Sequence, residues 1–242
     1  MMILITLALG LFFLVGAGVV KFYKNSEFIE HASIAVAFGA MIGIGVFDIA
    51  PEVLEMTPYS LYYLPIIGVI AGFLMLSVLD KFIPEHEEED NTEYNDENME
   101  HIGIISTFAI VIHNMIEGMA VYSLALSSPR QGIALMAGIG LHNIPMGMFL
   151  YSTLKSRSAL KRRGFMTVAV LSTFLGGLLM MFIRPYITSG FNCVLYGIAL
   201  GMILFIVLME LLPYIRKNKN RAMSCVCAVI GLVLVLVSTV LE

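Results

Sequence analysis

The chain has 242 residues and a formal net charge of −4, with 59% hydrophobic and only 13% charged residues. Its mean hydropathy is +0.89, and a soluble domain carries about twice this charged fraction. These values exclude a disordered chain, a coiled coil and a basic nucleic-acid binder, and they weigh against a soluble enzyme. The composition is typical of a polytopic membrane protein.

Eight apolar stretches follow one another along the chain, each long enough to cross a bilayer, since a spanning helix needs about 20 apolar residues. They occupy most of the sequence, so we predict an all-α fold in which residues 1–242 form a single transmembrane domain. The predicted spans are 2–20, 32–54, 61–83, 102–126, 131–154, 164–184, 190–213 and 222–241.

The distribution of basic residues gives the orientation. If the N-terminus is outside, twelve of the fourteen Lys and Arg residues fall at inner helix ends or in inner loops, and only Arg130 and Arg184 lie outside. Cytoplasmic loops of membrane proteins carry such an excess of positive charge. We therefore predict a multi-pass protein of the cell (inner) membrane with both termini outside.

The segment 85–101, between the third and fourth spans, differs from the rest of the chain. It holds nine of the eighteen acidic residues, together with His86 and His101. This charge density predicts a mobile cytoplasmic loop. Two interpretations stay open, a solvated linker and a weak trap for divalent cations, because flexible carboxylates and imidazoles suit such ions.

The fourth span carries polar residues where a membrane helix should be apolar. His113 and Glu117 are four residues apart and so share one helix face, and Asn114 adds a carbonyl oxygen beside them. An imidazole and a carboxylate form a metal-ligand pair. Intramembrane ionisable residues are costly and usually functional.

The fifth span repeats this pattern. His142 is followed by Asn143, and Met146 lies four residues after the histidine. Pro145 removes the hydrogen bond to the carbonyl of Leu141, so we expect a kink that frees backbone oxygen beside His142. The alternative is that both sets of polar groups only bridge helices by hydrogen bonds.

Acidic residues also occur near opposite ends of two other spans. Asp48 and Glu52 share a face near the outer end of the second span, and Glu210 lies near the inner end of the seventh. Acids at opposite mouths suit a route for cations, whereas the alternative is that they reach water at the membrane interface.

At this point the sequence resembles the ZIP family of divalent-metal transporters, in its bacterial zinc-uptake branch. The resemblance spans nearly the whole chain and is strongest in HNMIEG at 113–118 and HNIPMG at 142–147. GVFDIAPEVLE at 45–55 and GMILFIVLMELLP at 201–213 also resemble family patterns. The resemblance implies eight helices in a 3+2+3 arrangement with an inverted repeat, and a homodimer.

The resemblance also implies the metal ligands. A first site would use His113, Glu117, His142 and Met146, and a second would use Asn114, Glu117, Asn143, the position of Met146 and a carboxylate in the sixth span. The chain departs from the family twice, because Met146 and Thr173 stand where the family usually has Glu. Glu117 would therefore be the one carboxylate left to a second metal site, and a two-metal bridge would lack one of its two carboxylates.

These observations predict a transporter that moves divalent metal ions into the cytoplasm, with no cofactor, no nucleic-acid partner and no enzymatic activity. Zinc is the expected ion, and cadmium, iron(II), manganese and copper(I) are the alternatives. Two other functions stay open: an intramembrane zinc-dependent hydrolase, in which the same ligands activate water, and a non-transporting metal sensor.

Overall fold

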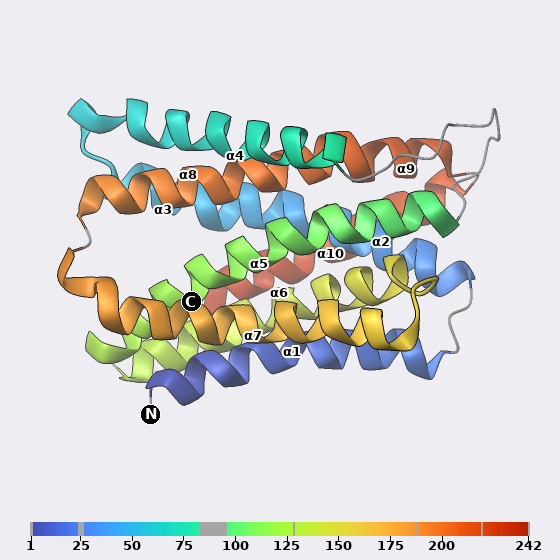
Figure 1. The fold of residues 1–242 in the computed structure, drawn as a ribbon, viewed down its shortest axis with the longest axis horizontal. Coiled ribbons are helices and arrows are strands. Elements are labelled where there is room, and N and C mark those ends of the chain that lie inside the picture. The colour runs from blue at the N-terminus through green and yellow to red at the C-terminus, as the bar shows by residue number, and fades with distance from the viewer. Residues whose placement is uncertain are drawn as a thin grey trace.

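The computed structural model describes residues 2–23, 27–82, 96–127, 129–186, 188–218 and 220–241. The chain forms a bundle of long helices that lie roughly along one common direction (Figure 1). The long α-helices are α1 (Met2–Phe22), α2 (Glu27–Gly43), α4 (Tyr63–Phe82), α5 (Asp96–Ser127), α6 (Pro129–Thr153), α7 (Ala159–Ile183), α8 (Ser189–Phe205) and α10 (Arg221–Leu241).

Shorter elements complete the fold. The π-helix η1 (Ile44–Ile49) joins α2 to α3 (Ala50–Met56), and the π-helix η4 (Ile206–Leu211) joins α8 to α9 (Leu212–Lys217). Two 3₁₀ turns, η2 (Tyr59–Leu61) and η3 (Arg184–Tyr186), lie at helix ends.

Seven helical stretches in the described part of the chain are long and apolar enough to cross a membrane. The predicted all-helical, polytopic membrane fold is therefore confirmed. The eighth helix, α6, has 25 residues and carries His142, Asn143 and Pro145 in its interior. It packs against α1, α5, α2 and α10, so its faces meet protein and it can carry more polar residues than its neighbours.

The helices pack as two units. Extensive contacts join α1 with α6 and α5 with α7, and further contacts join α1 with α7 and α5 with α6. These four helices form what we call the site unit. The other pairs in extensive contact are α4 with α8 and α2 with α10, and with η1, α3, η4 and α9 they form the flanking unit. The units meet mainly where α6 packs on α2 and α10.

The two π-helices are related in sequence and in structure. Each has six residues with an acid in fifth place, Asp48 in η1 and Glu210 in η4, and a proline follows three residues later in each case. The helices that contain them run in opposite directions along the bundle (Figure 1). This correspondence agrees with the predicted inverted repeat, and π-bulges of this kind often mark functional sites.

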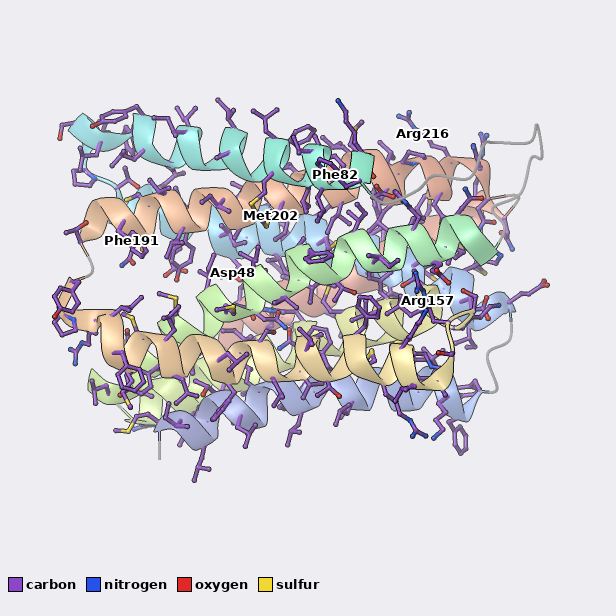
Figure 2. All side chains as sticks on the ribbon, viewed as in Figure 1. Asp48, Phe82, Arg157, Phe191, Met202 and Arg216 are labelled. Carbon is purple, nitrogen blue, oxygen red and sulfur yellow. The ribbon has the colours of Figure 1, made fainter. Side chains whose placement is uncertain are left out.

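Basic side chains gather at one end of the bundle. Arg157 and Arg216 lie at this end with Phe82, whereas Phe191 lies at the opposite end and Asp48 between the two (Figure 2). We call the first end the basic end and the other, where α1 starts and α10 finishes, the termini end. The charge asymmetry expected from the sequence is therefore present among the described residues.

The acidic segment predicted to be a mobile loop over 85–101 is described only in part. Residues 85–95, with His86, lie outside the described residues. Residues 96–101 differ from the prediction, because they form the first turns of α5. Burial of Met99 (8% exposed) and the contact of His101 with Asp80 anchor these turns despite their acidic composition.

Candidate metal centre

Three of the expected metal ligands converge between α5 and α6. Nε2 of His113 lies 2.7 Å from Oε1 of Glu117, one helical turn away on α5. Nε2 of His142, on α6, lies 2.8 Å from the same oxygen. The two imidazole rings have centroids 6.3 Å apart. One carboxylate oxygen thus faces two ring nitrogens, and their ligand atoms all lie within 4.8 Å of one another.

The three side chains are almost fully removed from the surface, with exposed fractions of 8% for His113, 8% for Glu117 and 1% for His142. Oε2 of Glu117 and Nδ1 of His142 have no hydrogen-bond partner in the described part of the chain. Buried polar atoms are normally satisfied, and a buried charge is normally paired or bound to a metal. The cluster therefore has the chemistry of a cation site.

The other three expected ligands lie around this cluster in different settings. Nδ2 of Asn114 donates to the backbone carbonyl of Ala169 on α7 at 3.3 Å, while its Oδ1 is left without a partner. Asn143 is fully buried, and neither of its amide atoms has a described partner. Met146 is 3% exposed and belongs to the main apolar cluster. The thioether is therefore buried among hydrocarbon side chains.

Pro145 lies in the interior of α6, which is helical from Pro129 to Thr153, so the proline does not end the helix. The kink expected there stays a prediction. Irregular backbone also lies in the π-helices η1 and η4, which carry Asp48 and Glu210.

Small residues bring α7 close to the ligand helix α5. A Cβ atom added to Gly118 would collide with the backbone of Thr173, and one added to Gly176 would collide with the backbone of Met115. The two helix backbones therefore touch, as small residues permit in membrane helices. Thr173 is fully buried, and its hydroxyl has no described partner.

A cavity of about 650 Å³ leads from the termini end to the buried cluster. Its lining includes His113 and Glu117 at one end, and Asp48 and Glu52 along one wall. The structure thus brings the two expected outer acids into the same cavity as the histidine–glutamate cluster.

The cavity lining also includes three polar residues that the sequence did not indicate as site residues, Glu55, Tyr196 and Thr239. Glu55 could have been found, because residues seven apart share a helix face and Glu55 follows Asp48 by seven positions. The role of Tyr196 could not be predicted in this way, because a single tyrosine in an apolar span is common in membrane helices and indicates no particular function. Its hydroxyl donates to Oε1 of Glu52 at 2.9 Å.

Glu210 lies away from this cavity, towards the basic end. It is 8% exposed and lies with Asp80 and His101 in a second group whose ligand atoms are all within 4.8 Å of one another. Nε2 of His101 lies 2.8 Å from Oδ1 of Asp80. Asp80 was missed from the sequence, although an acid beside Lys81 at the end of a span could have indicated it.

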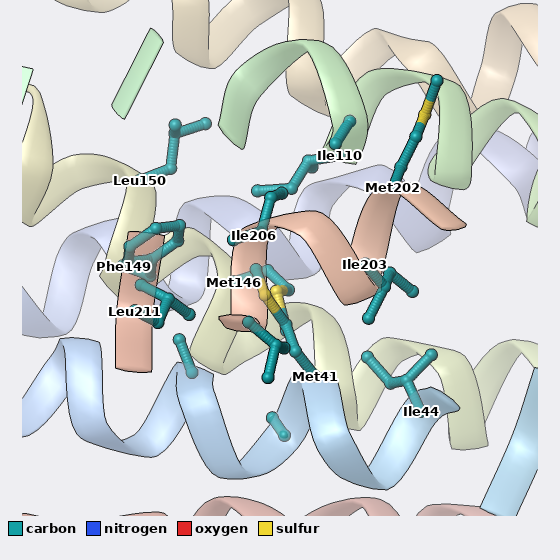
Figure 3. Packing of buried hydrophobic residues seen from close by; sticks show 14 of the residues in the cluster. Met41, Ile44, Ile110, Met146, Phe149, Leu150, Met202, Ile203, Ile206 and Leu211 are labelled. Carbon is teal, nitrogen blue, oxygen red and sulfur yellow. The ribbon is translucent and has the colours of Figure 1, made fainter. Parts of the chain in front are cut away.

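Buried apolar side chains from several helices pack against one another inside the bundle (Figure 3). Most members of this cluster on α5 precede His113, and its members on α6 follow His142, so much of the cluster lies on the basic side of the site, while Ile49 and Ile116, which also belong to it, line the cavity. The cluster includes Met41, Ile110, Met146, Phe149, Leu150, Ile206 and Leu211. Among the described residues, the cavity thus adjoins the site on the side of the termini end, and apolar packing predominates on the side of the basic end.

A polytopic bundle that encloses a cluster of two histidines and a glutamate, beside a cavity lined with acids, has the architecture of a membrane protein that handles metal cations. Comparison with known proteins gives the family. The profile of the family described as "ZIP Zinc transporter" matches residues 81–239. The chain belongs to the ZIP zinc transporter family.

Relatives within the family match the chain along most of its length. The zinc transporter ZupT of Lysinibacillus sphaericus is 27% identical, over 99% of this chain and 98% of the relative. That of Clostridium perfringens is 27% identical, over 100% and 95%, and that of Chlorobium limicola is 28% identical, over 89% and 87%. This family consists of transporters and not of enzymes, so family membership argues against the alternative of a zinc-dependent hydrolase.

Proposed function

We propose that this chain carries zinc across the membrane through a site formed by His113, Glu117 and His142. The observation that supports this most directly is the position of Oε1 of Glu117, 2.7 Å and 2.8 Å from the two ring nitrogens. A cation placed among these atoms would be bound by the ligand types that zinc prefers. The cavity gives it a path from the termini end.

The donor set accounts for zinc as the first choice of ion. Two imidazoles and one carboxylate leave a fourth position of a tetrahedral site for water or a protein ligand. Met146, Asn114 and Asn143 are the residues proposed to complete or surround it. With two neutral histidines and one carboxylate, a divalent ion leaves a net charge of +1, so a softer monovalent ion such as copper(I) is the alternative that the thioether would favour.

A single ion in the site is the favoured stoichiometry. The buried oxygens of Asn114, Asn143 and Thr173 are neutral, and Glu117 is the carboxylate that both proposed sites would have to share. Two divalent ions held by one carboxylate would repel each other strongly in a medium of low dielectric constant. We therefore assign Asn114 and Asn143 to hydration or support of one bound ion.

The route runs from the termini end, which we take to face the outside, to the basic end. Asp48 and Glu52 would gather cations from water, and the central residues would replace the ion's hydration shell. Glu210, with Asp80 and His101, would receive the ion on the inner side. This direction follows the excess of Lys and Arg at the basic end, which is a property of cytoplasmic faces.

Alternating access would come from movement of the site unit against the flanking unit. All three central ligands lie on α5 and α6, within the site unit, whereas Asp48, Glu52 and Glu210 lie on the flanking unit. A shift of one unit would carry the bound ion from the outer acids towards Glu210. Many transporters work by rigid-body movement of one bundle against another around such a site.

The second candidate function is a non-transporting metal sensor of the cell membrane. The absence of carboxylates at positions 146 and 173 favours the sensor. With fewer ligands than a transporter of this family usually has, the chain could bind an ion and yet offer it no path for release. A homodimer, as the family resemblance implies, is compatible with either function. In both cases residues 1–242 would act as one transmembrane domain.

Uptake into proteoliposomes separates the two functions. Purified protein would be tested with zinc, cadmium, iron(II), manganese and copper(I), beside His113→Ala and His142→Ala. Time-dependent uptake that both variants abolish is the expected result. If the wild type binds zinc in the same preparation and moves no ion, the transport proposal is wrong and the sensor takes its place.

A further inference from the structure

The wall of the cavity contains a hydrogen bond that the proposed route does not use. The hydroxyl of Tyr196, on α8, donates to Oε1 of Glu52, on α3, at 2.9 Å. Both side chains line the cavity that leads to His113 and Glu117. The two residues are 144 positions apart in the sequence, so the fold creates this contact.

The acids of this wall need to be held apart and yet remain charged. Asp48, Glu52 and Glu55 line one side of the cavity and come from one continuous helical stretch. Neighbouring like charges on one helix face repel, and a free glutamate side chain loses rotamer entropy when a cation orders it. A fixed Glu52 would present its carboxylate to an arriving ion with less of this cost.

Tyrosine suits this task because it is an uncharged donor. A lysine or arginine in its place would also hold Glu52, but it would cancel the negative charge that attracts cations. Among the described residues that line the cavity, none is Lys or Arg. The hydroxyl occupies one carboxylate oxygen and leaves the other for a metal ion or its bound water.

We propose that Tyr196 is a positioning residue for cation capture, which holds Glu52 beside Asp48 in the orientation that receives a hydrated divalent ion. This inference rests on the proposed transport function and adds a step to it. Tyr196 would lower the metal concentration at which the transporter is half-saturated, and it would leave the maximal rate of transport unchanged.

A purely structural role makes a different prediction. In that case the tyrosine hydrogen bond would only hold α3 against α8. A second hydrogen bond nearby joins the same two parts of the chain. The hydroxyl of Thr57, directly after α3, donates to Sγ of Cys193 on α8 at 3.1 Å, and both residues are buried. Thr57→Val removes that contact without touching a carboxylate, so it serves as the matched control.

The first measurement is the initial rate of zinc uptake against zinc concentration. Tyr196→Phe removes one hydroxyl and should raise KM about three- to tenfold with an unchanged maximal rate, as expected for loss of one hydrogen bond. Glu52→Gln should raise KM at least as much, and the double variant should match Glu52→Gln alone. Thr57→Val should leave KM unchanged.

Two results would overturn the proposal. One is a KM of Tyr196→Phe equal to that of the wild type. The other is a double variant in which the two effects multiply, because Tyr196 would then act independently of Glu52. In either case, uptake that His113→Ala abolishes would leave the transport function itself intact.

A second measurement does not depend on transport. Manganese(II) binding would be followed by the electron paramagnetic resonance signal of the free ion, in purified protein that carries His113→Ala and His142→Ala. Weak binding that Tyr196→Phe reduces about threefold supports the positioning role even if no ion is transported. Equal binding with and without the tyrosine hydroxyl would reject it.

Discussion

The two ends of the bundle differ in what separates the histidine–glutamate site from water. Towards the termini end there is an open cavity lined with carboxylates. Towards the basic end there is mostly apolar packing, and beyond it a group formed by Asp80, His101 and Glu210. This asymmetry fits the proposed alternating access, in which the site faces one side of the membrane at a time.

Polar contacts between the two units lie at the closed end. Lys155, in the turn after α6, pairs with Glu30 on α2 at 2.5 Å, and His101 on α5 contacts Asp80 on α4 at 2.8 Å. Both contacts join the site unit to the flanking unit. In the proposed mechanism, opening this end would have to break both the apolar packing and these polar contacts.

The largest effect on zinc binding should come from a substitution in the central histidine–glutamate cluster, which lies between the two ends. Glu117→Gln removes the carboxylate whose oxygen lies between His113 and His142, so the bound ion loses its only anionic ligand in the cluster. Mutation of a residue that supports a metal ligand typically lowers metal affinity about 10–100-fold. Because Glu117 is proposed as a direct ligand, we expect its loss to lower zinc affinity by at least about 100-fold. Isothermal titration and zinc uptake would measure the loss.

Glu117→Asp is the matched variant, because it keeps the charge and shortens the side chain. It should bind zinc more tightly than Glu117→Gln. Equal losses in the two variants would show that geometry, and not charge, dominates at this position.

The second effect tests the apolar side of the site. Met146→Glu places a carboxylate where the family usually has one but where this chain is packed with hydrocarbon. We expect a lower melting temperature without metal, because a buried unpaired charge is costly, and a larger rise on addition of zinc than in the wild type. Differential scanning fluorimetry would measure both shifts.

Met146→Gln controls for size and polarity, since it lacks the charge. A zinc-dependent rise of Met146→Glu no larger than that of Met146→Gln would contradict the argument that the wild-type site carries an uncompensated positive charge.

The contrast between the two ends was only partly predictable from the sequence. The spans, the asymmetry of basic residues and the pairing of His113 with Glu117 follow from patterns with a helical period, which the sequence carries locally. Burial inside the bundle, the arrangement in two units and the contact of Tyr196 with Glu52 depend on which helices become neighbours. No local pattern encodes that choice.

The error over residues 96–101 has the same origin. Their acidic composition indicated a loop, but contacts with α4 extend α5 through them, so tertiary packing prevailed over local preference. The irregular backbone in η1 and η4 was not predicted either, because no single residue type indicates a π-helix.

The third effect concerns the ties at the closed end. Lys155→Ala breaks the pair with Glu30 and should make the apolar cluster accessible from the basic end more often. A reporter cysteine, Leu150→Cys, would be placed in a variant lacking Cys193, Cys225 and Cys227. Its labelling by a membrane-impermeant maleimide from the basic side should become about three- to tenfold faster, as expected for loss of a partly buried ion pair.

The chain provides a matched control for this variant. Arg157 pairs with Glu100 at 2.5 Å, and both residues belong to the site unit or to the turn within it. Arg157→Ala removes the same charge without freeing the units, so labelling should stay at the wild-type rate. If both variants accelerate labelling equally, the effect arises from loss of positive charge and the tie between units has no special role.

The smallest effect is expected at the open mouth of the cavity. Glu55 is exposed, so its charge is shared with water, and it acts by attracting cations over a distance of about 10 Å at 0.1 M salt. Glu55→Gln should raise the KM for zinc about twofold at low ionic strength and have no effect in about 1 M salt, where charges are screened within about 3 Å. Glu27→Gln, an exposed acid at the basic end, should change neither value. An effect of Glu55→Gln that persists in high salt would mean that this carboxylate binds the ion directly, and the capture region would then extend from Asp48 to the rim of the cavity.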